Sequence, residues 1–345
     1  MKKSKISFGV ALLPIIVLLL TGAFSVLFWE VGMLVPLISG IITTGIIGIF
    51  HDFDWNDLET GLKKGVSSAL TPVFILLIVG TIIGTWIASG TIPAMIYFGL
   101  KFLNPSVFVP LSALITAIVA TTIGTSFTSI ATVGVALMAV GNAMGFPAPL
   151  TAAAVISGAF FGDKLSPLSD TTNIAPAMAG CTLFEHVGHM LWDTLPAFAL
   201  SLIIYWAVSL NHIGSSISGA EQINTLIQGL ESSFNLTPVL FILPLITIIL
   251  AVRKTPAIPT LLSMSILGGI FSIIFQGSSL VSVLESFTSG YNSSSGLEML
   301  DSLLSKGGIN SMGNTIILLI TAAALGGIMQ EVGILDSILT KIMSL

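Results

Sequence analysis

The stretch "FFGDKLSPLSDTTNIAP", residues 160–176, decides how this chain folds, because it places charged side chains inside the most apolar part of the sequence. It contains Asp163, Lys164 and Asp170 together with two prolines. A carboxylate in or near a membrane is costly, so it is expected to face the protein interior, where it is paired or hydrated. The default interpretation of such a residue is an ion or proton pathway.

The composition around this stretch is that of a polytopic, all-α membrane protein. Of the 345 residues, 54% are hydrophobic and only 8% are charged, and the mean hydropathy is +1.04. A helix that crosses a bilayer core needs about 20 apolar residues. Runs of that kind recur at 8–29, 31–50, 66–89, 105–123, 127–146, 192–210, 236–252, 256–275 and 313–331. A soluble enzyme is excluded, and the sequence carries no basic patch for nucleic acid.

The few lysines and arginines predict the orientation in the membrane. They gather at the N-terminus, after the second run and between two later runs: Lys2, Lys3, Lys5, Lys63, Lys64, Arg253 and Lys254. Loops rich in these residues stay in the cytoplasm, so the N-terminus is predicted to be cytoplasmic and the protein to lie in the cell membrane. The first run follows a charged start like that of a signal peptide, but no convincing cleavage site follows, so it is expected to stay as the first membrane helix.

The sequence also contains a candidate internal repeat. A shift of 243 residues superposes Lys63 on Lys306, Gly65 on Gly308, Ser68 on Ser311, Leu76 on Leu319, Gly84 on Gly327 and Gly90 on Gly333. The two helices predicted there run in opposite directions, which is typical of the inverted-topology repeats of secondary transporters. The predicted organisation is a first repeat at 1–210, a polar linker at 211–235 and a second repeat at 236–345. Nothing in the second repeat corresponds to 103–210, so it is expected to be incomplete.

The centre of the first repeat predicts broken or re-entrant helices. Prolines interrupt the apolar runs between 92 and 190, and the hydroxyl-rich "GTSFTSIATVG" occupies 124–134. At membrane depth a free backbone carbonyl is tolerated only where protein or a water-filled cavity satisfies it. Such carbonyls, with hydroxyls of Thr125 and Ser126, suit a small cation such as sodium, and the ends of half-helices direct dipoles at it.

Two interpretations of the charged stretch are open. In the first, Asp163 and Asp170 titrate, because a carboxylate in this setting holds either a proton or a sodium ion but poorly both at once. Lys164 then pairs with Asp163 or titrates with the site. In the second, 162–170 is a connecting loop in which Asp163 and Lys164 are solvated and Asp170 caps a helix.

The residues "GDKLSPLSDTTNIAP", "GTSFTSIATVG" and "EHVGHMLWDTLPA" resemble the NhaC-type sodium/proton antiporter family. The resemblance extends over nearly the whole chain. It implies an inverted-repeat antiporter that exchanges sodium for protons and sometimes couples this to carboxylates such as malate and lactate. Its motif falls here on Gly162, Asp163, Lys164, Ser166, Pro167, Ser169, Asp170, Thr171 and Thr172. The family's second acidic, hydroxyl-rich motif is lacking from this chain.

A further cluster, Glu185, His186 and His189, lies close together at helical spacing and is a possible proton relay. The alternative is an interfacial amphipathic helix with Trp192 at the headgroup level. The pattern is not His-Glu-x-x-His, so a zinc peptidase is disfavoured.

The predicted function is therefore secondary antiport of sodium and protons, without enzymatic activity and without a cofactor. The residues assigned to ion or proton binding are Asp163, Asp170, Lys164, Ser169, Thr171, Thr172, Thr125 and Ser126, with sodium held by Asp170, Thr171 and Thr172. The expected partners are sodium, protons, the bilayer and a possible second copy of the chain. The alternatives are sodium- or proton-coupled malate and lactate exchange and, from another class, an inactive or partner-requiring subunit.

Overall fold

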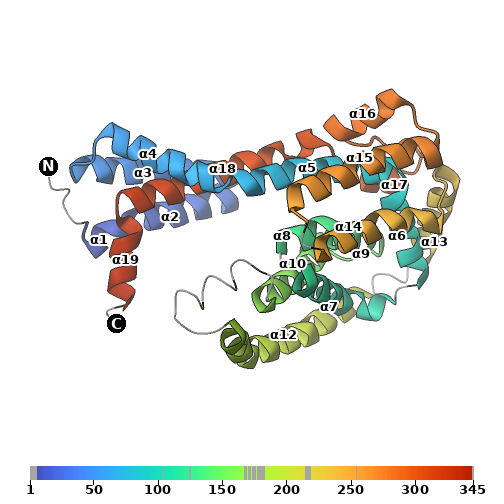
Figure 1. Cartoon of the computed structure of the whole chain (residues 1–345), viewed down its shortest axis with the longest axis horizontal. Helices are drawn as coiled ribbons and strands as arrows, with labels where there is room; N and C mark the ends of the chain where they lie inside the picture. The colour runs from blue at the N-terminus through green and yellow to red at the C-terminus, as the bar shows by residue number, and fades with distance from the viewer. Residues whose placement is uncertain are drawn as a thin grey trace. The chain divides into compact units, whose positions relative to one another are not determined.

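The computed structural model describes residues 6–102, 104–123, 126–166, 169, 172, 176, 183–213, 219–253 and 255–343. Within these ranges the chain is helical and contains no strand, which confirms the all-α class (Figure 1). The first half contains α1 (Phe8–Ala11), α2 (Leu13–Leu27), α3 (Leu34–Phe50), α4 (Trp55–Ser68), α5 (Leu70–Ala88), α6 (Thr91–Phe102), α7 (Pro105–Ile123), α8 (Ser126–Ser129), the π-helix η1 (Ile130–Gly134), α9 (Val135–Ala143) and α10 (Ala148–Leu165). The rest contains α12 (Leu183–Ile213), α13 (Gly219–Ser233), η3 (Pro238–Phe241), α14 (Ile242–Val252), α15 (Ala257–Gln276), α16 (Leu280–Thr288), α17 (Glu298–Leu304), η4 (Ile309–Met312), α18 (Gly313–Glu331) and α19 (Ile334–Met343).

Several of these helices can cross a membrane. In the described chain five are long and apolar enough: Phe8–Leu27, Leu70–Ala88, Glu185–His212, Ile258–Gln276 and Ile309–Glu331. A sixth crossing is possible if Asn224–Ser233 and Pro238–Thr247, which bend by 94°, form one broken span. Shorter apolar helices occupy Leu34–Phe50 and Pro105–Thr121. The chain is therefore a multi-pass membrane protein, as its hydropathy predicts.

Helix boundaries agree closely with two of the predicted apolar runs. The runs at 105–123 and 313–331 coincide with α7 and α18. The sequence did not predict α10, because glycine, alanine, serine and charge dilute its apolar character. The segment 211–235, predicted as a polar linker, contains the end of α12 and the helix α13.

The helices group into two compact units, residues 1–77 with 312–345 (unit 1) and residues 78–311 (unit 2). These units are defined by contacts. The predicted division into 1–210, 211–235 and 236–345 concerns repeated segments instead, and it stays a prediction.

In unit 1, α18 packs along α3 and α4. Helix α4 begins at a capping box in which the Asp54 carboxylate accepts from the Asp57 backbone N–H at 2.8 Å and the Asp57 carboxylate accepts from Asp54 N–H at 3.2 Å. Leu58, buried on α4, belongs to an apolar cluster that includes residues of α3 and α18. Because lipid tails are as apolar as these side chains, this cluster stabilises unit 1 through close van der Waals packing where it lies in the membrane.

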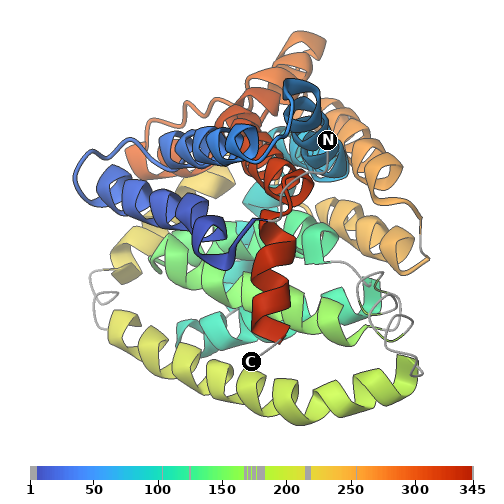
Figure 2. The same ribbon diagram turned by 90° about the vertical axis from the view of Figure 1, so that its left-hand side faces the viewer.

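In unit 2, α7, α10 and α12 lie side by side, with the long α12 drawn in yellow-green at the lower edge of Figure 2. Helix α12 packs on α7 and α10, and the Phe161 and Phe198 rings stack across the α10–α12 contact with centroids 3.9 Å apart. Helices α6, α9 and α13 pack beside this group. The candidate ion site lies within unit 2.

The spacing of 243 residues reappears in the helices. Both ends of α5 and α18 differ by 243 residues, and the glycines that follow, Gly90 and Gly333, have positive φ angles of 81° and 83°. The close backbone contacts match as well: Gly84 approaches Gly308 in unit 2, and Gly327 approaches Gly65 in unit 1. Under the shift of 243 residues, Gly84 corresponds to Gly327 and Gly308 corresponds to Gly65, so the two contacts involve corresponding glycines.

Candidate cation site

Asp163 lies in the last turn of α10, where the sequence ends the helix. Ser166 precedes Pro167, and a residue before proline is driven out of the helical region. Ser166 accordingly has φ −75° and ψ 126°, and it follows the last helical residue, Leu165. Asp163 and Lys164 are therefore helical, so the connecting loop of the alternative is wrong for these two residues, but the Lys164 side chain is 46% exposed, as that alternative expects.

Helix α10 lies close against α7, and two glycines permit the approach. A Cβ atom at Gly158 would overlap the carbonyl oxygen of Ala113, and one at Gly162 would overlap that of Ala117. Small residues four apart are the usual means by which membrane helices approach so closely. Because the numbering rises in the same direction along both contacts, α7 and α10 run parallel.

The parallel arrangement brings the C-terminal ends of both helices to the same level. One turn beyond Gly162, the Ser166 hydroxyl donates to the carbonyl oxygen of Thr121 at 2.7 Å. Each helix C-terminus carries the equivalent of about half a negative charge. Two such ends beside one carboxylate form a region that attracts a cation.

The Asp163 carboxylate has an oxygen atom without a hydrogen-bond partner among the described residues of this region. Its Oδ1 atom is buried and accepts no hydrogen bond from any residue that the structure describes. A buried carboxylate oxygen without a partner is costly, and a bound proton or cation would relieve that cost. Lys164 does not supply this charge: its Nζ lies 3.8 Å from Oδ2 of Asp193 on α12, with both side chains largely exposed.

Two described residues after α10, Ser169 and Thr172, contact the end of that helix. The Thr172 hydroxyl donates to the carbonyl oxygens of Asp163 at 3.1 Å and Lys164 at 3.0 Å. The Ser169 backbone N–H donates to the Ser166 carbonyl at 3.2 Å, and the side chains of Ser169 and Thr172 are buried. A hydroxyl that donates to a carbonyl keeps lone pairs for a cation, so the assignment of Thr172 to sodium binding remains open.

The hydroxyl-rich stretch has the irregular backbone predicted for it. After α7 come the four-residue α8, the π-helix η1 and then α9. Ser126 and Ser129 on α8 are buried, and α8 packs against both α7 and α10. These hydroxyls therefore lie on an element that contacts both helices of the candidate site. Asp170, Thr171 and Thr125, also assigned to this site, lie outside the described residues.

The second predicted cluster lies at the start of α12. Glu185 and His189 are exposed and His186 is half-buried. In the part of the chain that the structure describes, no group of three His, Cys, Asp or Glu residues could hold a metal. Trp192 is 83% exposed, in keeping with the alternative of an interfacial helix. The proton relay stays a prediction.

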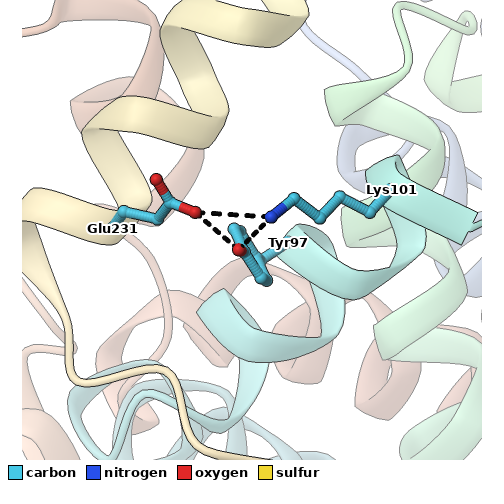
Figure 3. A network of polar contacts seen from close by, with 3 residues as sticks. All are labelled: Tyr97, Lys101 and Glu231. Carbon is cyan, nitrogen blue, oxygen red and sulfur yellow. Dashed lines mark hydrogen bonds and ion pairs between the residues drawn. The ribbon is translucent and has the colours of Figure 1, made fainter.

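Figure 3 shows a polar cluster that the sequence did not predict. The Tyr97 hydroxyl on α6 donates to Oε1 of Glu231 on α13 at 2.5 Å and accepts from Lys101. The Lys101 ammonium lies 3.4 Å from the same carboxylate oxygen and 4.3 Å from the centre of the Tyr97 ring. Tyr97 and Lys101 are four residues apart on one helix, which a sequence can show, but their pairing with α13 depends on the fold.

The fold and this site define a multi-pass membrane transporter with a carboxylate at the ends of two parallel helices. The family model described as the Na+/H+ antiporter family matches residues 158–345. The Na(+)/H(+) antiporter NhaC of Alkalihalophilus pseudofirmus is 36% identical over 345 residues, 99% of this chain and 73% of that protein. The chain therefore belongs to the Na+/H+ antiporter family, with NhaC among its relatives.

Other relatives carry different names. The malate-2H(+)/Na(+)-lactate antiporter of Bacillus subtilis is 34% identical over 295 residues, 86% of this chain and 63% of that protein. The arginine/ornithine antiporter ArcD of Halobacterium salinarum is 37% identical over 335 residues, 96% of this chain and 69% of that protein. The chain thus spans 63% to 73% of the length of these three relatives. No solved structure matches it.

Proposed function

We propose that this chain exchanges sodium ions for protons across the cell membrane, with its N-terminus in the cytoplasm, and that Asp163 is a group for which the two cations compete. One observation carries the proposal: the buried, unpartnered Oδ1 of Asp163 lies in α10 near the level where α7 and α10 both end. Ends of interrupted helices and unwound backbone carbonyls coordinate sodium and protons in secondary transporters.

The chemistry of exchange follows from this setting. Sodium prefers oxygen ligands, and the site offers a carboxylate together with the hydroxyls of Ser126, Ser169 and Thr172. Occupation by sodium disfavours the proton and occupation by the proton disfavours sodium, because each neutralises the same charge. Movement of one repeat against the other would expose the site to each side in turn.

A second function is favoured by the name of one relative, the malate-2H(+)/Na(+)-lactate antiporter. A carboxylate substrate needs a positive partner, and Lys164, at the end of α10 with a 46% exposed side chain, is near the site. Counterflow of labelled malate in vesicles separates the two functions, because a sodium/proton exchanger gives none. A chain that inserts well and transports nothing would support the third alternative, a subunit that requires a partner.

The test measures sodium-dependent proton flux in everted vesicles from antiporter-deficient cells at matched expression. The chain is compared with its Asp163→Asn and Asp170→Asn variants and with Glu59→Gln, which removes a carboxylate that pairs with Lys63 on the surface. The expected result is flux in the parent and in Glu59→Gln, and background flux in Asp163→Asn. Normal flux in Asp163→Asn would disprove the role of this residue.

A further inference from the structure

We propose that the π-turn Ile130–Gly134 sets the rotation of α8, so that Ser126 and Ser129 face the ends of α7 and α10 as oxygen ligands for the transported cation. This inference rests on the proposed function, because the cation is the one exchanged there. It assigns a positioning role to a backbone irregularity and a ligand role to Ser129, whose hydroxyl is fully buried.

The π-turn interrupts what would otherwise be one helix from Ser126 to Ala143. At its end the Val135 backbone N–H donates to the carbonyl oxygen of Ile130, five residues earlier. A turn of this kind contains one more residue than an α-helical turn. Since each residue of an α-helix turns by about 100°, α8 is rotated by roughly that angle relative to α9.

The neighbours of the two segments show this rotation. Helix α9 packs mainly against α6 and α10 and less against α7, whereas α8 packs equally against α7 and α10. On α8 the Ser126 and Ser129 side chains are 3% and 0% exposed, while Phe127 is 51% exposed. The two serines therefore lie on the buried side of α8, a helix that packs against α7 and α10, and the phenylalanine lies on its exposed side.

The local sequence accounts for the irregular turn without a proline. Residues Ile130, Thr132 and Val133 are β-branched and Gly134 lacks a side chain, so this stretch is a poor α-helix former. Gly134 also lets the turn approach α10, because a Cβ atom there would lie 2.8 Å from Cγ1 of Val155. Single π-turns inside helices are frequently found at functional sites. Here the turn lies between α9 and α8, the helix that carries the Ser126 and Ser129 hydroxyls.

The experiment deletes Ala131, which removes the extra residue and restores α-helical pitch. A matched second variant combines this deletion with one alanine inserted after Leu137, which moves the extra residue along the helix and restores the rotation of α8. Loss of a residue that positions cation ligands commonly weakens binding by about 10-fold to 100-fold. The deletion is therefore expected to raise the half-saturating sodium concentration by about 10-fold or more, and the compensated variant to recover most of this loss.

A second readout follows the rotation itself. Ser126, Phe127 and Ser129 are replaced by cysteine one at a time in a Cys181→Ser background and labelled with a membrane-permeant maleimide. Without the deletion, Ser126→Cys and Ser129→Cys, which face the proposed cation site, are expected to react faster than Phe127→Cys on the other side of the helix, because maleimide attacks the thiolate and apolar surroundings suppress thiolate formation. Sodium is expected to slow the reaction of the first two. In the deletion variant the order of labelling rates at the three positions is expected to change, and in the compensated variant the original order is expected to return.

Three results would overturn the inference: an unchanged labelling pattern after the deletion, an unchanged sodium dependence despite a rotated pattern, or equal labelling at all three positions in the full-length chain. The last measurement tests the orientation of α8 even if the deletion variant does not insert. Absence of sodium-dependent flux in the parent would instead contradict the proposed function, while the labelling would still decide how α8 is turned.

Discussion

Two pairs of tightly packed helices, α7–α10 in unit 2 and α4–α18 in unit 1, each contain a carboxylate. They differ in whether that carboxylate has a charged partner. Both pairs depend on glycines where backbones meet: Gly158 and Gly162 on α10, and Gly65 and Gly327 between α4 and α18. In α4–α18 the carboxylate of Glu331 is paired with the Lys64 ammonium at 2.8 Å. In α7–α10 the buried Oδ1 of Asp163 has no such partner among the described residues.

This difference supports the proposal that Asp163, and not Glu331, binds the transported cation. A carboxylate with a fixed cation beside it has little need for another, so a structural role is expected for Glu331. A carboxylate whose buried oxygen lacks a partner needs a mobile proton or cation. Close packing alone does not mark a site, since both pairs have it.

The largest expected effect is that of Asp163→Asn. It should abolish sodium-dependent proton flux, because the amide cannot exchange a proton for a cation. Glu331→Gln, the corresponding change in the other pair, should retain flux. Vesicle assays at matched expression compare the two. Equal loss of flux in both variants would show that the unpaired carboxylate of Asp163 is no more important for transport than the paired carboxylate of Glu331.

The next effect concerns the glycines. Gly162→Ala and Gly327→Ala each place a Cβ atom into neighbouring backbone, and such overpacking typically costs about 1–3 kcal/mol. The control is Gly326→Ala on α18, where an added Cβ meets no described atom within 4 Å and helix propensity favours alanine by about 1 kcal/mol. The midpoints of thermal unfolding in detergent are expected to fall for the first two and not for the third. A fall of the same size in Gly326→Ala would show that helix packing is not the cause.

A smaller effect is expected from Lys64→Met. The lysine side chain is 67% exposed and its partner Glu331 is 23% exposed, and ion pairs near the surface contribute about 0–1 kcal/mol. A double-mutant cycle with Glu331→Gln in unfolding experiments measures the coupling. A coupling free energy well above this range, or a changed sodium affinity, would indicate that Glu331 takes part in transport and is not only structural.

The last expected effect concerns the pH dependence of stability, and it is expected for Asp301, a third carboxylate whose hydrogen-bond donors are neutral. Hydrogen bonds from the Ser293 and Ser295 hydroxyls, and from the backbone N–H groups of Ser295 and Gly296, lower the pKa of the Asp301 carboxyl from 3.8 to about 2. Because the folded-state pKa lies below the unfolded one, this stabilisation is fully present above about pH 4 and declines as the pH falls towards 2.

The measurement for Asp301 compares thermal unfolding of the parent and Asp301→Asn between pH 3 and 8. The difference between them should be constant above about pH 5 and shrink below about pH 4. A difference that changes between pH 6 and 8 would mean that another titrating group is coupled to this loop.

Much of the fold was predictable because it depends on local patterns. The runs at 105–123 and 313–331 match α7 and α18, since an apolar segment in a membrane must close its own backbone hydrogen bonds. Helix α7 continues even though it contains Pro110. The amphipathic α4, the diluted α10 and the helical α13 were not predicted as helices, because their stability depends on neighbours that the sequence does not show. The same holds for the contact of Tyr97 with Glu231.

By itself the sequence determined the membrane class, the family and the motif that contains Asp163, since composition, apolar runs and a contiguous motif can be read along the chain. Only the tertiary structure decided that α7 and α10 run parallel, that Lys164 pairs with Asp193, and that Lys64 pairs with Glu331. The physical reason is that hydropathy acts over a few turns of one helix. The partner of a charge depends on which backbones approach closely, and that is settled by glycines and side chains far apart in the sequence.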